Sequence, residues 1–346
     1  MNNENIKDME EEIAKNSTFI NFLSKYVEDS NYVYWLYMTV YYPLIVTFLL
    51  PCVFVLLIYF SSMTLYIFKF HRWVLMKEIR ADDVNFWKVA NKFIAAVWDA
   101  HATIYHGYEI HGLEHLPRNG PALLIYYHGA IPIDMYYFVA KIYLKLDRLT
   151  YTVGDRFLFK LPGWKIIAQA LKVSPGTVKS CTETLNRGNL LAISPGGVYE
   201  AQFGNNYYEL LWQNRLGFAK VAIESKAPII PMFTENLREG FRNIGIARKF
   251  FITLYNWTRI PVRPIYGGFP VKFRTHLGPP IYYEEGITPK ELQEKTAMAI
   301  EKLIVENQRI PGSIVGGLLD RFFNQKQIDV VLNKTRQRRF INNKDT

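Results

Sequence analysis

The sequence has few cysteines, and the two it has, Cys52 and Cys181, lie far apart, so we expect neither a disulfide framework nor a zinc site. It has no internal repeat and no low-complexity tract, which excludes repeat architectures. No zinc-finger spacing, ribonucleoprotein motif or basic-zipper heptad accompanies the net charge of +10, so we expect no nucleic-acid partner. The absence of a Gly-x-Ser-x-Gly nucleophile elbow argues against a lipase.

Charge is also missing from one long stretch, since residues 32–68 contain no Asp, Glu, Lys, Arg or His. About 20 apolar residues suffice to cross a bilayer as a helix, and this stretch lies too far from the start to be a cleaved signal peptide. A straight helix of this length would measure about 55 Å, against a hydrocarbon core of about 30 Å. We therefore expect one tilted span or two short passes, with Pro51 favouring a turn and a re-entrant hairpin.

The segments that flank the apolar stretch carry opposite charge. Residues 1–31 are acidic on balance, whereas basic residues follow the stretch and recur near the end of the chain. Basic residues beside a span favour the cytosolic side and attract anionic head groups. We expect an acidic N-terminal segment (1–31), the membrane segment (32–68), juxtamembrane and interfacial helices (69–107), a globular domain (108–323) and a basic tail (324–346). A core-facing role for the amphipathic helix before residue 107 is the alternative to an interfacial one.

Apolar runs alternate with helical patterns through the globular domain. Strands are expected in "PALLIYYH", "YTVG", "NLLAI", "APIIPMFT" and "VKFRTHL", and helices near residues 133–146, 164–171, 177–187 and 209–225. A further helix is indicated by Thr288 as N-cap, Pro289 at the first helical position and Glu291 completing a capping box. This alternation predicts an α/β fold, a mostly parallel sheet flanked by helices, anchored by the N-terminal transmembrane segment or hairpin.

The stretch "YYHGAIPIDMYY" carries the first candidate catalytic residues. His128 follows a buried apolar run and should stand at the C-terminal edge of a strand, where α/β proteins place their ligands. Gly129 permits a sharp turn, and Pro132 suits the start of the next helix, which puts Asp134 in its first turn. The histidine can then take a proton from a hydroxyl while the carboxylate fixes its tautomer. Alternatively, Asp134 only complements the helix dipole and His128 only ends the strand.

Three further stretches follow in the chain. In "VGDRFLFKLPGW", Arg156 offers forked hydrogen bonds to a phosphate or an ester carbonyl, and Phe157 suits the wall of an acyl groove. In "SPGGVYEA", the paired glycines allow the backbone to approach a ligand or an oxyanion closely. The last, "APIIPMFTEN", is a short buried strand interrupted by Pro231.

Together these stretches resemble the glycerolipid acyltransferase superfamily, which includes PlsC-like enzymes and diacylglycerol acyltransferases, and most closely its storage-lipid-synthesising branch. The superfamily's first motif is His, four residues, then Asp, whereas five residues separate His128 and Asp134. The third motif resembles the form "PGG, two residues, Glu" of type-two diacylglycerol acyltransferases through Pro195, Gly196, Gly197 and Glu200. The resemblance covers residues 108–236 and implies that 108–323 is an acyltransferase domain.

The resemblance implies a membrane-bound O-acyltransferase of the endoplasmic reticulum whose catalytic domain faces the cytosol. It implies fatty acyl-CoA as donor, mono- or diacylglycerol as acceptor, a membrane-lipid environment, no cofactor and no metal. His128 and Asp134 would be catalytic, and the substrate-binding residues would be Arg156, Phe157, Pro195, Gly196, Gly197 and Glu200. Phosphate-handling relatives end the third motif with an Arg that this chain lacks, which favours a neutral acceptor. The alternatives are a lysophospholipid acyltransferase of the same superfamily and a catalytically inactive lipid-binding membrane protein.

Overall fold

The computed structural model describes residues 34–76 and 84–323. Internal contacts divide the chain into two units, Met1–Leu49 and Leu50–Thr346. The acidic segment 1–31 and the basic tail 324–346 lie outside the described residues, and the predicted domain boundaries stay a prediction.

One long apolar helix begins in the first unit and ends in the second. A π-helical turn, η1 (Tyr37–Tyr41), leads into α3 (Tyr42–Met76). Pro51 lies inside α3, so the turn expected there, and the hairpin that depended on it, are wrong. A proline removes one helical hydrogen bond, but the apolar residues on both sides satisfy their backbone groups in an apolar medium only by staying helical. The stretch Tyr34–Phe70 is long and apolar enough to cross a membrane, which indicates membrane association.

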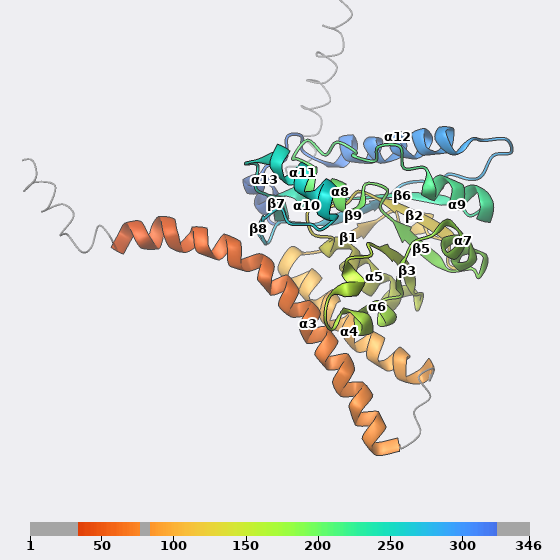
Figure 1. The fold of residues 1–346 in the computed structure, drawn as a ribbon, viewed down its shortest axis with the longest axis horizontal. Coiled ribbons are helices and arrows are strands. Elements are labelled where there is room, and N and C mark those ends of the chain that lie inside the picture. Colours follow the sequence, from red (N-terminus) through yellow and green to blue (C-terminus); the bar gives the residue numbers. More distant parts are fainter. Residues whose placement is uncertain (1–33, 77–83, 324–346) are drawn as a thin grey trace, which may run out of the picture. The chain divides into compact units, whose positions relative to one another are not determined.

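The second unit is built on a seven-stranded, mostly parallel sheet, as predicted (Figure 1). The order is β1-β9-β6-β2-β5-β3-β4, and the one antiparallel pair among these described strands is β6 with β9. A separate antiparallel pair joins β7 and β8. The strands are β1 (Glu109–His111), β2 (Ala122–Tyr126), β3 (Thr150–Gly154), β4 (Val173–Pro175), β5 (Leu190–Ile193), β6 (Ile229–Thr234), β7 (Phe241–Asn243), β8 (Ile265–Gly267) and β9 (Arg274–Leu277).

Helices cover both faces of the sheet, with α9 and α12 on one side and α4, α5 and α6 on the other (Figure 1). The helices after α3 are α4 (Val84–His106), α5 (Ile133–Leu146), α6 (Trp164–Ala170), α7 (Val178–Asn186), α8 (Gly197–Phe203), α9 (Gly217–Ser225), α10 (Leu237–Gly240), α11 (Arg248–Thr258), α12 (Pro289–Asn307) and α13 (Ile314–Leu319), with short 3₁₀ turns η2 (Leu113–His115) and η3 (Leu158–Lys160). The helix expected from residue 209 begins only at Gly217, because the preceding residues form turns. The Thr288 capping box is confirmed, since Thr288 and Glu291 exchange side-chain to main-chain bonds.

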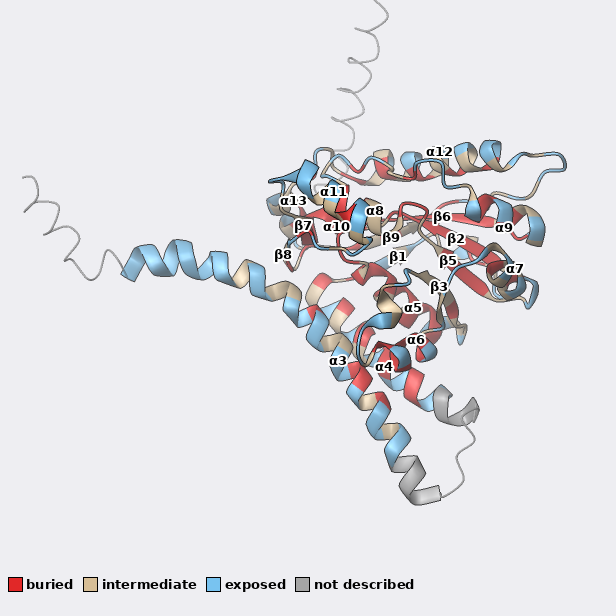
Figure 2. Ribbon diagram, in the orientation of Figure 1, coloured by how far each residue is buried: buried red, intermediate tan, exposed pale blue. Residues whose placement is uncertain are grey.

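The core explains why the strands are continuous apolar runs. Leu124 and Tyr126 of β2 pack in one buried cluster with Phe138 of α5. Leu123 and Ile125, on the other face of the strand, belong to the cluster that contains Ile300 of α12. Side chains alternate along a strand, so a strand buried on both faces must be apolar throughout. Figure 2 shows the strands buried at the centre of this unit.

Helix α4, which forms the amphipathic pattern before residue 107, has one buried side, and its predicted place in the membrane interface stays a prediction. Ala90, Ile94 and Trp98 are buried, and α4 packs along α5. The ring of Trp98 stacks on that of Tyr136 with centroids 4.8 Å apart. The inner face of α4 is therefore part of the core.

Candidate active site

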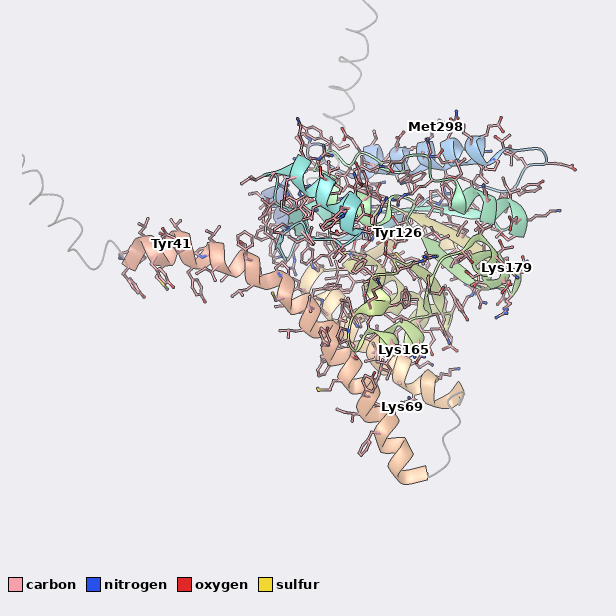
Figure 3. All side chains as sticks on the ribbon, viewed as in Figure 1. Tyr41, Lys69, Tyr126, Lys165, Lys179 and Met298 are labelled. Carbon is pink, nitrogen blue, oxygen red and sulfur yellow. The ribbon has the colours of Figure 1, made fainter. Side chains whose placement is uncertain are left out.

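The candidate active site lies at the carboxyl ends of two neighbouring parallel strands. β2 pairs with β5 in a register that places Ile125 opposite Ile193. His128 follows β2 by two residues, and Pro195 follows β5 by two. Because carboxyl ends of parallel strands meet at one edge of a sheet, the first and third motifs are neighbours. Tyr126, the last residue of β2, marks this edge in Figure 3.

The surroundings of His128 define its tautomer. Its Nδ1 lies 2.7 Å from the carbonyl oxygen of Gly129. A carbonyl oxygen can only accept, so Nδ1 carries the proton and Nε2 keeps its lone pair. Burial lowers the pKa of His128 to about 4, against the raising effect of the Gly129 carbonyl. The imidazole is therefore neutral at physiological pH, with Nε2 ready to accept a proton.

Asp134 is buried in the first turn of α5, where the sequence placed it. Burial raises the pKa of its carboxyl to about 7, although the nearby Thr234 hydroxyl and Met135 N–H lower it in part. Neither carboxylate oxygen makes a hydrogen bond of normal geometry to a described residue. The Nδ1–H of His128 points to Gly129, so the two side chains are not hydrogen-bonded in this structure, and the role of the pair stays a prediction.

The buried side chain of Glu200, in the third motif, binds the main chain at His128, in the first motif. Its side chain is fully buried, Oε2 accepts the main-chain N–H of His128 at 2.8 Å, and Oε1 accepts that of Leu211 at 2.9 Å. Burial raises the pKa of Glu200 to about 7, and these two N–H donors lower it in part. The contacts of the carboxylate are with main-chain atoms, so it holds the turn that carries His128. The substrate contact expected for Glu200 stays a prediction.

The turn of Pro195, Gly196 and Gly197 leads directly into α8. A Cβ on Gly196 would lie 2.4 Å from that of Glu200, and Gly197 has φ +47°, so both positions need glycine. The guanidinium of Arg215, an exposed residue, donates to the carbonyl oxygens of Pro195 and Gly196, both at 2.9 Å. A cation thus stands beside the third motif, supplied by a segment that the sequence analysis did not connect with it.

Arg238 is the second basic residue that sequence reasoning missed. It is buried, and its guanidinium donates to the Tyr127 hydroxyl at 2.9 Å and to the carbonyl oxygens of His128 at 3.0 Å, Glu200 at 2.5 Å and Ala201 at 2.9 Å. One side chain from α10 therefore joins the end of β2 to α8. A buried charge with this many acceptors gives no local signal, because its partners are far away in the sequence.

Arg156 and Phe157 follow β3, whose neighbour in the sheet is β5. Arg156 is exposed, while Phe157 is partly buried and its N–H donates to Oδ1 of Asp155 at 3.1 Å. β3 runs parallel to β5, so both residues lie at the same edge of the sheet as the glycine turn. Their predicted contacts with substrate stay a prediction.

Comparison with known proteins shows the family to which the chain belongs. Residues 107–235 match the family model described as Acyltransferase. Proteins named "DGAT1/2-independent enzyme synthesizing storage lipids" are similar over most of their length: 47% identical in Bos taurus (90% of each chain), 48% in Homo sapiens (87% of this chain, 90% of that protein) and 42% in Gallus gallus (90% and 92%). The crystal structure of the 1-acyl-sn-glycerophosphate (LPA) acyltransferase PlsC from Thermotoga maritima covers 71% of this chain and 95% of that chain, with a TM-score of 0.44 and 12% identity.

The sheet edge that carries His128 is thus part of an acyltransferase domain. The identities extend over nearly the whole chain, and the protein belongs to the acyltransferase family of these storage-lipid-synthesising relatives.

Proposed function

We propose that this enzyme transfers a fatty acyl group from acyl-CoA to monoacylglycerol or diacylglycerol at the endoplasmic reticulum membrane, with its catalytic domain in the cytosol. The observation that carries the proposal is the neutral imidazole of His128, whose Nδ1–H faces Gly129 and whose Nε2 is available as a base. The names of the relatives support a storage-lipid product. The long apolar stretch Tyr34–Phe70 supports an acceptor that resides in a membrane.

In the proposed reaction, Nε2 of His128 takes the proton of the acceptor hydroxyl while the hydroxyl oxygen attacks the thioester carbonyl. The carbon–sulfur bond then breaks, the acyl group remains as an ester of the acceptor, and the imidazolium returns its proton to the leaving thiolate. No acyl-enzyme is needed, because the thioester is already activated and the enzyme needs only to position the two substrates.

The other residues have proposed roles that follow from their contacts. Gly196 and Gly197 allow close approach of the reacting carbonyl to the backbone. Asp134, when ionised, stabilises the imidazolium by its charge. Glu200 and Arg238 position the turn and α8 through the main-chain atoms that they bind. Arg156 and Phe157, in their sequence-derived role, contact the substrates.

The test is acyl transfer by membranes that contain the wild type or His128→Ala at equal protein level. Labelled acyl-CoA is offered separately with monoacylglycerol, diacylglycerol and lysophospholipid. We expect label in di- and triacylglycerol, lost in the variant by roughly 10²–10⁴-fold, the usual contribution of a general base. If the variant were as active as the wild type with every acceptor, His128 would not be the catalytic base, and a lipid-binding protein would be favoured.

A second acceptor class has one observation in its favour. The third motif carries no cation of its own, which favours a neutral acceptor, yet the Arg215 guanidinium lies against the carbonyls of Pro195 and Gly196. This cation suits the phosphate of a lysophospholipid. Arg215→Gln, with exposed Lys220→Gln of α9 as control, separates the two: selective loss of phospholipid product would favour this second function, and unchanged triacylglycerol synthesis without phospholipid product would support the first.

A further inference from the structure

Helix α11 and its flanks present an apolar face to solvent. Ile246, Phe250, Trp257 and Ile260 are exposed by 78, 61, 84 and 51%. Phe250 and Trp257 lie seven residues apart within α11, so their side chains project from one side of the helix, while Ile246 and Ile260 lie in the segments just before and just after it. Figure 2 colours much of α11 as exposed. Large apolar side chains grouped in this way mark a surface that contacts another protein or a membrane.

The chain segment that contains this face carries charges of one sign. Between Glu239 and Glu284 the sequence has no Asp or Glu, while it has seven Lys and Arg residues. Lys249 and Arg259, at the two ends of α11, are both exposed. An apolar face on a segment whose charged side chains are all basic complements a bilayer with anionic head groups.

The opposite side of α11 packs on the helix that begins at the glycine turn of the site. Tyr255 is buried, and its ring centroid lies 5.9 Å from that of Phe203 and 6.3 Å from that of Tyr199, both in α8. The guanidinium of Arg248 donates to the carbonyl oxygen of Phe203 at 3.2 Å. The exposed face of α11 is therefore one helix diameter away from the helix that carries Gly197 and Glu200.

The connection that contains α11 also reaches the long apolar helix. α11 lies between β7 and β8, and Gly268 directly follows β8. A Cβ on Gly268 would lie 2.5 Å from Cβ of Leu50 in α3, and the Gly268 carbonyl accepts the hydroxyl of Tyr105 at 2.5 Å. The segment that contains the exposed apolar face of α11 is thus packed, near Gly268, against α3.

We propose that α11 lies in the membrane interface, with Phe250 and Trp257 among the acyl chains and Lys249 and Arg259 at anionic phospholipid head groups. Amphipathic helices with aromatic residues on one face and basic residues beside it lie parallel to the bilayer surface in this way. This membrane contact of α11, in addition to that of α3, places α8 and the glycine turn next to the lipid, where an apolar acceptor resides. The membrane contact itself does not depend on which acceptor the enzyme uses.

The test measures the depth of α11 in a bilayer with the full-length protein. Cys52 and Cys181 are replaced by alanine, and a nitroxide spin label is attached to Trp257→Cys in proteoliposomes of phosphatidylcholine and phosphatidylserine. The matched control is a label on Met298→Cys, 62% exposed on α12 (Figure 3). Electron paramagnetic resonance then compares the access of apolar oxygen and of a water-soluble nickel chelate. We expect the label at position 257 to favour oxygen and the label at 298 to favour nickel.

Two outcomes would overturn the proposal. Equal nickel access at positions 257 and 298 would place α11 in water. Protection at 257 from both reagents, with spin–spin broadening, would show that a second copy of the chain covers the face instead of lipid. The charge component is tested separately with Lys249→Glu, which should reduce the oxygen preference at 257 in vesicles that contain phosphatidylserine and leave it unchanged in pure phosphatidylcholine. An equal effect in both vesicles would refute the contact with anionic head groups.

Discussion

Replacing Arg238 with methionine tests whether the buried guanidinium holds the site together. Methionine fills a similar volume but donates no hydrogen bond. The change removes the four bonds that Arg238 donates to Tyr127, His128, Glu200 and Ala201. Their loss should destabilise the fold and release the turn that carries the catalytic base.

The expected loss of stability depends on which acceptors of Arg238 keep another hydrogen-bond donor. The Ala201 carbonyl keeps the side-chain amide of Asn243 as a donor, and the Glu200 carbonyl keeps the N–H of Gly204. For the carbonyl of His128 the described residues provide no second hydrogen-bond donor. An unsatisfied buried acceptor costs about 1–3 kcal/mol, and a hydrogen bond to a charged group contributes about 1.5–3 kcal/mol. We expect a loss of about 3–5 kcal/mol, which is a large part of the usual stability of a domain.

The assay is thermal unfolding of the purified full-length protein in detergent. At about 2–4 °C per kcal/mol, the expected loss lowers Tm by roughly 6–20 °C. Arg187→Met is the control, because Arg187 is exposed at the end of α7 and its loss should change stability by less than about 0.5 kcal/mol. If the two variants unfold at the same temperature, the four bonds of Arg238 do not stabilise the fold.

Three further predictions concern the site itself. Gly196→Ala should cost about 1–3 kcal/mol and most of the activity, because its Cβ meets Glu200, whereas Gly217→Ala, with open space at its Cβ, should cost neither in the same unfolding and transfer assays. Asp134→Asn should raise Tm more at pH 8 than at pH 5. Burial raises the carboxyl pKa from 3.8 to about 7, so the wild type loses stability progressively as pH rises from about 4 to about 7, by a few kcal/mol in all. A Tm difference between Asn variant and wild type that is independent of pH would refute this. For His128, whose pKa burial lowers to about 4, kcat/KM should fall with acid near pH 4, and a midpoint near 6.5 would show an exposed imidazole.

Much of the fold is encoded over short stretches of sequence. The expected strands are all found within a few residues of their predicted places, and helix α5 has the predicted bounds of 133–146. Thr288, Pro289 and Glu291 suffice to predict the N-terminus of α12. Periodicity of apolar residues and helix caps act over a turn or two, so they can be read without knowing the rest of the chain. The turn expected at Pro51 failed because a single proline does not outweigh a long apolar run on both sides.

Some residues of the candidate site are indicated by the sequence nearby, and others are not. His128, Asp134 and the paired glycines were found from the sequence, because they end predicted strands or begin predicted helices. Arg238 and Arg215 were missed, and the bond from Arg238 to His128 spans 110 residues. Nothing within either segment indicates such a contact.

By itself, then, the sequence determined the apolar segment, the parallel α/β pattern and the residues at the strand ends, since each depends on neighbours a few positions away. Only the tertiary structure decided that Nδ1 of His128 faces Gly129 rather than Asp134, that Glu200 binds main chain, and that α11 turns aromatic side chains to the outside. These features depend on contacts between groups that are far apart in the sequence. Burial, hydrogen-bond geometry and shifted pKa values arise only when the folded chain brings such groups together.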